Sequence, residues 1–166
     1  LAPVMDSAAM VDTLTDYDPA VLAPVIDTVR KVATMLDAQT TFLGFAGSPW
    51  TVATYMIAGQ GSREQAAARL LAYSDPGAMQ ALIERIEGAT IDYLSRQIEA
   101  GVEAVQLFDS WAGSLSPAQF ERWVIAPNAR IIAALRERHP TTPLIGFPKG
   151  VGGKLVAYAN ETGADA

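Results

Sequence analysis

The fold of this chain is decided by two stretches, Gly44-Phe45-Ala46-Gly47-Ser48-Pro49-Trp50 and Gln106-Leu107-Phe108-Asp109-Ser110-Trp111-Ala112-Gly113. Each stretch is a short apolar run that ends in small, polar and aromatic residues. In a parallel α/β protein such endings fall at the carboxyl ends of strands, where ligand sites are built. The two stretches therefore predict a parallel sheet, and they indicate the edge of that sheet at which a site should lie.

On either side of these stretches, strand-like and helix-like apolar patterns alternate along the chain. Short buried strands are expected over residues 41–46, 104–108 and 144–147. Helices are expected over residues 19–36, 50–57, 63–73, 76–98, 117–138 and 151–162. Residues 1–17 show no clean periodicity, so we expect them to form a connecting segment.

Local start signals support several of these helices. Asp18-Pro19 and Asp75-Pro76 each place an N-cap residue before a proline at the first helical position. The four-residue patterns that begin at Ser62 and Ser116 match the capping box. Pro127 lies inside the helix expected over residues 117–138 and predicts a kink there.

The alternation of elements predicts parallel strands joined by right-handed crossovers. A doubly wound sheet and a β/α barrel both fit it, and we favour the barrel because no Gly-x-Gly-x-x-Gly phosphate turn follows any expected strand. Three to four βα units cannot close an eight-stranded barrel. Residues 1–166 are therefore expected to form a single segment of a partial (β/α)8 TIM barrel, cut from a longer protein because the chain starts at Leu1 rather than Met.

Composition excludes several classes of function. The net charge of −6 argues against nucleic acid as a partner, because phosphate binding needs a basic surface. No apolar run approaches the roughly 20 residues that cross a bilayer, so we expect a cytoplasmic protein without a membrane partner. With no cysteine and one histidine, His139, the chain has little material for a metal centre, and none is expected.

Four polar residues near the expected strand ends could carry chemistry. The Tyr55 phenol could donate a hydrogen bond to a substrate carboxylate, or its ring could anchor a short helix. Ser110 could offer a hydroxyl at the same edge, or act as a turn serine. Asp109 suggests an acid or a metal ligand, and Lys149 could neutralise a carboxylate or be a solvated lysine. The residues alone leave these alternatives open.

Five motifs in the right order and spacing resemble the uroporphyrinogen decarboxylase family. They are residues 43–51 with Tyr55-Met56, residues 73–76, residues 97–101, residues 105–113 and residues 146–150. The resemblance covers nearly the whole chain from about Thr13. It implies a cofactor-independent β/α-barrel enzyme, usually a homodimer, that converts uroporphyrinogen to coproporphyrinogen by turning four acetate side chains into methyl groups.

The resemblance also implies which residues meet the tetrapyrrole substrate. The family's substrate-binding tyrosine and serine fall on Tyr55 and Ser110, and Phe45 and Phe108 are implied to line the pocket. The family's N-terminal arginines, central aspartate and late histidine have no counterparts here. We therefore expect no catalytic residue within this segment.

Two other interpretations remain at this point. The chain could be a truncated segment without catalytic activity. It could also resemble the related corrinoid methyltransferases, which hold zinc with histidine and cysteine. The lack of cysteine, and Phe147-Pro148-Lys149 at the place where a zinc motif would be sought, count against the methyltransferase.

Overall fold

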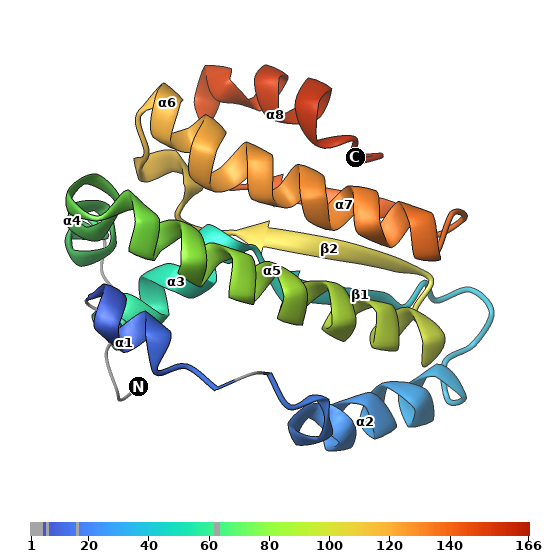
Figure 1. Cartoon of the computed structure of the whole chain (residues 1–166). Coiled ribbons are helices and arrows are strands. Elements are labelled where there is room, and N and C mark those ends of the chain that lie inside the picture. Colours follow the sequence, from blue (N-terminus) through green and yellow to red (C-terminus); the bar gives the residue numbers. More distant parts are fainter. Residues whose placement is uncertain (1–4, 6, 16, 62–63) are drawn as a thin grey trace.

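The computed structural model describes residues 5, 7–15, 17–61 and 64–166, and in this part of the chain three parallel strands form one sheet (Figure 1). Strands β1 (Leu43–Gly47), β2 (Ala104–Asp109) and β3 (Leu144–Pro148) lie in the order β1-β2-β3. The register places Phe108 between Gly47 and Phe147. The three expected strands are confirmed, with small differences at their ends, and the fold is α/β.

Helices connect and flank the strands. Their bounds are α1 (Ala8–Asp12), η1 (Pro19–Leu22), α2 (Ala23–Ala33), α3 (Pro49–Ala58), α4 (Ala66–Ser74), α5 (Pro76–Glu99), η2 (Ala112–Ser114), α6 (Pro117–Phe120), η3 (Glu121–Ile125), α7 (Ala126–Arg138), η4 (Gly152–Lys154) and α8 (Leu155–Thr162). The prediction of a connecting segment over residues 1–17 is wrong at α1, because a five-residue helix is too short to show a periodic pattern.

The predicted aspartate caps are confirmed. The Asp18 and Asp75 side chains each accept a backbone N–H at 2.9 Å, at the starts of η1 and α5. The cap predicted at Ser62 lies outside the described residues. Helix α4 begins at Ala66, later than the start expected from that cap.

The helix expected over residues 117–138 is continuous, and its middle is a wide π-helical turn, η3. A π turn directly before Pro127 accommodates a residue that donates no N–H and crowds the preceding turn. The capping box predicted at Ser116 is wrong, since its side chain makes no cap hydrogen bond. Its partner Gln119 instead accepts the indole N–H of Trp123 at 2.6 Å.

Helices α5 and α7 run along one face of the sheet (Figure 1). The buried residues between them and the strands form one core cluster: Ala46, Leu94, Val102, Val105, Leu107, Ile131, Ile132, Leu135 and Leu144. Gly44 faces the same layer, where a Cβ would lie 2.8 Å from Oε1 of Gln97 and would push that side chain aside. A second cluster, built around Trp50, Met79 and Trp123, joins α3, α4, α5 and η3 near the carboxyl ends of the strands.

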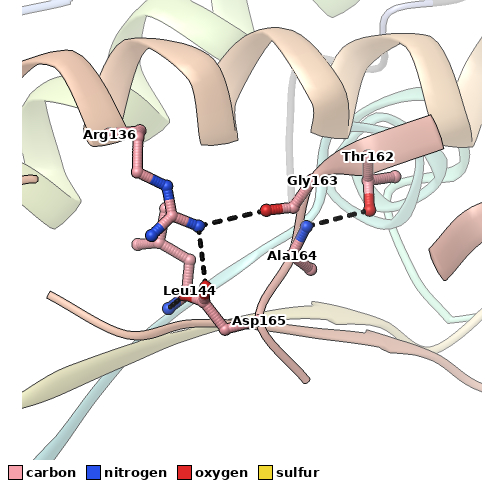
Figure 2. Close-up of polar contacts among 6 residues, drawn as sticks. All are labelled: Arg136, Leu144, Thr162, Gly163, Ala164 and Asp165. Atoms are coloured by element: carbon pink, nitrogen blue, oxygen red, sulfur yellow. Dashed lines mark hydrogen bonds and ion pairs between the residues drawn. The ribbon is translucent and has the colours of Figure 1, made fainter. Parts of the chain in front are cut away.

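After α8 the chain returns to the open edge of β3 (Figure 2). The Asp165 N–H donates to the Leu144 carbonyl at 2.8 Å, and Asp165 Oδ2 accepts the Leu144 N–H at 2.8 Å. Arg136 on α7 donates from Nη2 to the Gly163 carbonyl at 3.1 Å and to Asp165 Oδ1 at 3.0 Å. These bonds hold residues 163–166 against the sheet.

Within the described ranges, no helix combines the length and the apolar character needed to span a lipid bilayer.

Candidate active site at the carboxyl ends of the strands

The carboxyl ends of the three strands lie side by side, and main-chain hydrogen bonds join the residues at these ends. Ser48, the first residue after β1, donates its N–H to the Phe108 carbonyl at 2.8 Å. Lys149, the first residue after β3, donates to the Asp109 carbonyl at 3.0 Å. The residues that follow each strand therefore lie at one edge of the sheet, where a ligand site was predicted.

Three aromatic side chains form a row on the sheet face opposite α5 and α7. We call Phe45, Phe108 and Phe147 the phenylalanine row; the ring centroids of Phe45 and Phe108 lie 5.7 Å apart, and those of Phe108 and Phe147 lie 5.6 Å apart, both edge to face. Phe45 is 60% exposed and Phe147 is 46% exposed, which makes this face strongly apolar. Phe147 was not among the predicted site residues, although it occupies the corresponding alternate position of its strand.

Ser110 and Tyr55 lie on two different elements. Ser110 directly follows β2 and is half-buried, two positions after Phe108, whereas Tyr55 is half-buried on α3. Their connection is indirect: Thr51, one helical turn before Tyr55, donates its hydroxyl to the side chain of Asp109, which precedes Ser110. Of the four predicted residues, Phe45 and Phe108 are in direct contact.

Asp109 points away from the phenylalanine row, because successive side chains of a strand alternate between faces. It is fully buried, and its Oδ1 accepts the Thr51 hydroxyl at 2.7 Å. Burial raises the pKa of this carboxyl to about 7, although hydrogen bonds from Thr51 and the Trp111 N–H act in the opposite direction. The nearby Tyr158 phenol is also buried, and the Asp109 charge adds to the burial that raises its pKa.

This placement bears on two interpretations that the sequence left open. In the described part of the chain, no group of three or more His, Cys, Asp or Glu side chains could hold a metal ion, so Asp109 has no partners there for a metal site. Its position in the layer between sheet and helices favours a structural carboxyl over an acid acting on a ligand. Lys149 is exposed, which favours a solvated lysine.

A cavity of about 610 Å³ lies beside the open edge of β1. Its walls are mostly apolar and include Tyr17, Phe45, Val52, Met56, Leu82 and Tyr93. Phe45 thus belongs both to this cavity and to the phenylalanine row, while Tyr55, Phe108 and Ser110 do not line the cavity. The predicted residues therefore lie along the strand ends rather than within a single enclosed pocket of this chain.

The family model for uroporphyrinogen decarboxylase (URO-D) matches residues 1–166. The chain belongs to the uroporphyrinogen decarboxylase family. The resemblance seen in the sequence motifs is thereby confirmed over the whole chain.

Individual uroporphyrinogen decarboxylases show the same similarity. The protein of that name from Rhizorhabdus wittichii is 66% identical over 163 residues, which cover 96% of this chain and 47% of the relative. The one from Sphingopyxis alaskensis is 63% identical over 166 residues, or 100% and 48% of the two chains. The one from Paracoccus denitrificans is 51% identical over 165 residues, or 99% and 46%. The chain spans about half the length of the curated relatives it matches.

Proposed function

We propose that the protein carrying this chain is a uroporphyrinogen decarboxylase, a carboxy-lyase of porphyrin biosynthesis, and that this chain forms one wall of its substrate pocket. The observation that carries the proposal is the 66% identity to a protein of that name along 96% of the chain. The reaction converts the four acetate side chains of uroporphyrinogen III to methyl groups and gives coproporphyrinogen III and four CO2.

The chemistry suits a site of this composition. Loss of CO2 leaves an electron pair, and a pyrrole ring protonated at carbon accepts it without help from a metal or prosthetic group. The protein has to hold the carboxylates and exclude water from the reacting one. In this proposal the phenylalanine row packs against the apolar macrocycle, and the hydroxyls of Tyr55 and Ser110 donate to substrate carboxylates.

We also propose that residues 1–166 are a single segment of a partial (β/α)8 TIM barrel. The parallel order β1-β2-β3 and the helices on one face of the sheet support it. The hydrogen bonds between Asp165 and Leu144 support a further strand position beside β3. In a closed barrel the phenylalanine row would face the interior.

The partners and location of the whole protein complete the proposal. We propose a cytoplasmic homodimer whose ligand is the tetrapyrrole and which binds neither nucleic acid nor membranes. The family resemblance supports the dimer, and the net charge of −6 supports the lack of a nucleic-acid partner. Sedimentation equilibrium of the purified protein would test the dimer.

Two substitutions test the substrate contacts in the protein that carries this chain. Tyr55→Phe and Ser110→Ala each remove one hydroxyl, and each should lower kcat/KM about 10- to 100-fold, because a hydrogen bond to a charged group is lost. Chromatography of the oxidised porphyrin products gives the rates. Tyr73→Phe is the matched control, since Tyr73 is an exposed tyrosine on α4. Unchanged rates in either test variant would remove that residue from the site, and an unmodified protein that releases no CO2 from uroporphyrinogen would overturn the function.

Residues 1–166 alone are proposed to be inactive. The family's arginines, central aspartate and late histidine have no counterparts in this sequence. The open edge of β1 should also make the isolated segment prone to associate. Turnover by a monomer of these 166 residues would contradict this proposal.

A further inference from the structure

We propose that Thr51 and Asp109 are positioning residues, whose mutual hydrogen bond fixes Ser110 relative to Tyr55. The inference rests on the decarboxylase function proposed above and adds two residues to its machinery. Neither residue is placed in contact with the substrate; both act through the two hydroxyl-bearing residues beside them.

The Thr51 hydroxyl contacts the residues on both sides of Ser110. It donates to Asp109 Oδ1 at 2.7 Å, and it accepts the main-chain N–H of Trp111 at 3.4 Å. Ser110 is therefore held between two contacts to the same oxygen atom. If that hydroxyl moved, Asp109 and Trp111, the two neighbours of Ser110, would both have to move or lose a hydrogen bond.

The same hydroxyl belongs to the helix that carries Tyr55. Thr51 and Tyr55 are four residues apart on α3, so they lie one turn apart on the same side of the helix. Helix α3 starts at Pro49, immediately after β1. The bond from Thr51 to Asp109 thus joins two segments 58 residues apart in sequence, each of which presents one predicted substrate contact.

Burial makes this bond hard to replace. Asp109 is fully buried and Thr51 is 7% exposed, so solvent cannot readily take over either partner. The main-chain bonds from Ser48 to Phe108 and from Lys149 to Asp109 fix the end of β2, and the Gly113 N–H, which donates to the Lys149 carbonyl at 3.2 Å, fixes the far end of the turn that follows it. Between these two fixed points, the Thr51 hydroxyl is the side-chain group that bonds to the residues on both sides of Ser110.

Three variants of α3 in the protein that carries this chain test the inference. Thr51→Val removes the hydroxyl and keeps the shape, and it should lower kcat/KM about tenfold. Thr51→Ser keeps a hydroxyl and should restore most of that loss. Thr54→Val is the matched control, because Thr54 is a buried threonine of the same helix whose hydroxyl donates only to the Thr51 carbonyl. Equal rates for Thr51→Val and Thr54→Val would overturn the inference.

A double-mutant cycle separates positioning from general structural support. If Thr51 acts through Ser110, Thr51→Val should cause little further loss in a Ser110→Ala background. If the double variant loses the product of the two single-variant losses in kcat/KM, the inference is overturned and the proposed function still stands. If Ser110→Ala and Tyr55→Phe are each without effect, the proposed site itself fails, and the inference fails with it.

A double variant keeps the test possible if Thr51→Val alone does not fold. Replacing both partners, as Thr51→Val with Asp109→Leu, leaves neither side chain of this bond buried without its partner, although the Trp111 N–H loses its acceptor. The double change should therefore preserve the fold better than either single change. Circular dichroism checks the fold. The double variant should show the same loss of about tenfold in kcat/KM, and wild-type kinetics would overturn the inference.

Discussion

The side-chain amide of Gln97 forms two hydrogen bonds with the main chain of Phe45. Its Oε1 accepts the Phe45 N–H at 3.1 Å, and its Nε2 donates to the Phe45 carbonyl at 3.0 Å. Backbone groups of alternate residues point to opposite sides of a strand, and Phe42 and Ser48 bond toward β2. Phe45 therefore points to the open edge of β1, and Gln97 pairs with it there as a neighbouring strand would.

This pairing predicts a stability effect. Gln97→Ala should lower the free energy of unfolding by about 1–3 kcal/mol, because two main-chain groups next to the core lose their partners. Urea unfolding of the protein that carries this chain measures the change. Gln80→Ala, also on α5 but bonded only to Glu84 at the surface, should change stability by less than about 0.5 kcal/mol. Equal effects of the two substitutions would contradict the assigned role.

Removing either partner of the ion pair between α5 and α7 should destabilise the fold, but by different amounts. Arg130 donates from Nη2 and Nε to both oxygens of Glu87, at 2.6 and 2.9 Å, while the side chains are 48% and 9% exposed, respectively. Arg130→Ala leaves a buried carboxylate unpaired and should cost about 2–4 kcal/mol, whereas Glu87→Gln leaves an arginine that water can solvate and should cost less. Thermal or urea unfolding gives both values. The exposed pair of Arg30 and Asp27 is the control, where either deletion should cost less than about 1 kcal/mol.

Asp109 should make the fold less stable as pH rises. Its pKa is raised from 3.8 to about 7 by burial, so the folded protein holds this proton at pH values where the unfolded chain has released it. The stability contributed by this group is complete below about pH 4, falls as pH rises to about 7, and is level above that. Asp109→Asn stays neutral and should remove this slope, an effect of at most about 4 kcal/mol. Unfolding free energies measured at pH 5 and pH 8 test it, and identical slopes in both proteins would rule out the linkage.

Asp165 should protect the open edge of β3 locally. Its carboxylate accepts the Leu144 N–H and the Arg136 guanidinium, and these bonds lower its pKa (Figure 2). Asp165→Ala should therefore speed amide hydrogen exchange at Leu144, with little change at Leu107 in the neighbouring strand. Exchange followed by NMR or mass spectrometry gives both rates. Unchanged protection at Leu144 would show that the Asp165 carboxylate does not hold this edge.

Decarboxylation should not depend on zinc. In the proposed reaction the protonated pyrrole accepts the electron pair, so treatment with EDTA should leave turnover intact. Activity that is lost on chelation and restored by zinc would instead favour the corrinoid methyltransferase interpretation.

Much of the fold was predictable because its signals are local. The first two strands, expected to end at residues 46 and 108, end one residue later at Gly47 and Asp109, because short apolar runs with turn residues after them mark a strand end to within about a residue. The caps at Asp18 and Asp75 follow from a single dipeptide each. Helix α1 was missed because five residues are too few to show a helical period. The π turn before Pro127 was not predicted, because a proline in a sequence indicates a distortion of the helix but not the type of turn that accommodates it.

The polar contacts within the candidate site were not predictable in the same way. Thr51 and Asp109 are 58 residues apart, and Gln97 and Phe45 are 52 residues apart, so no local pattern pairs them. Asp109 was a candidate acid or metal ligand because it carries a carboxylate. Its burial and its hydrogen bond to Thr51 show that it points into the helix layer. The roles of Tyr55 and Ser110 came from family motifs and stay predictions.

The order β1-β2-β3 means that each strand pairs with the one made just before it during synthesis. A ribosome releases the chain from its amino end, and every pairing in this sheet needs only sequence that has already emerged. Each new βα unit can dock on a finished neighbour without waiting for a distant segment. The phenylalanine row remains uncovered during this growth, so the nascent chain should be a chaperone client until its apolar face is enclosed.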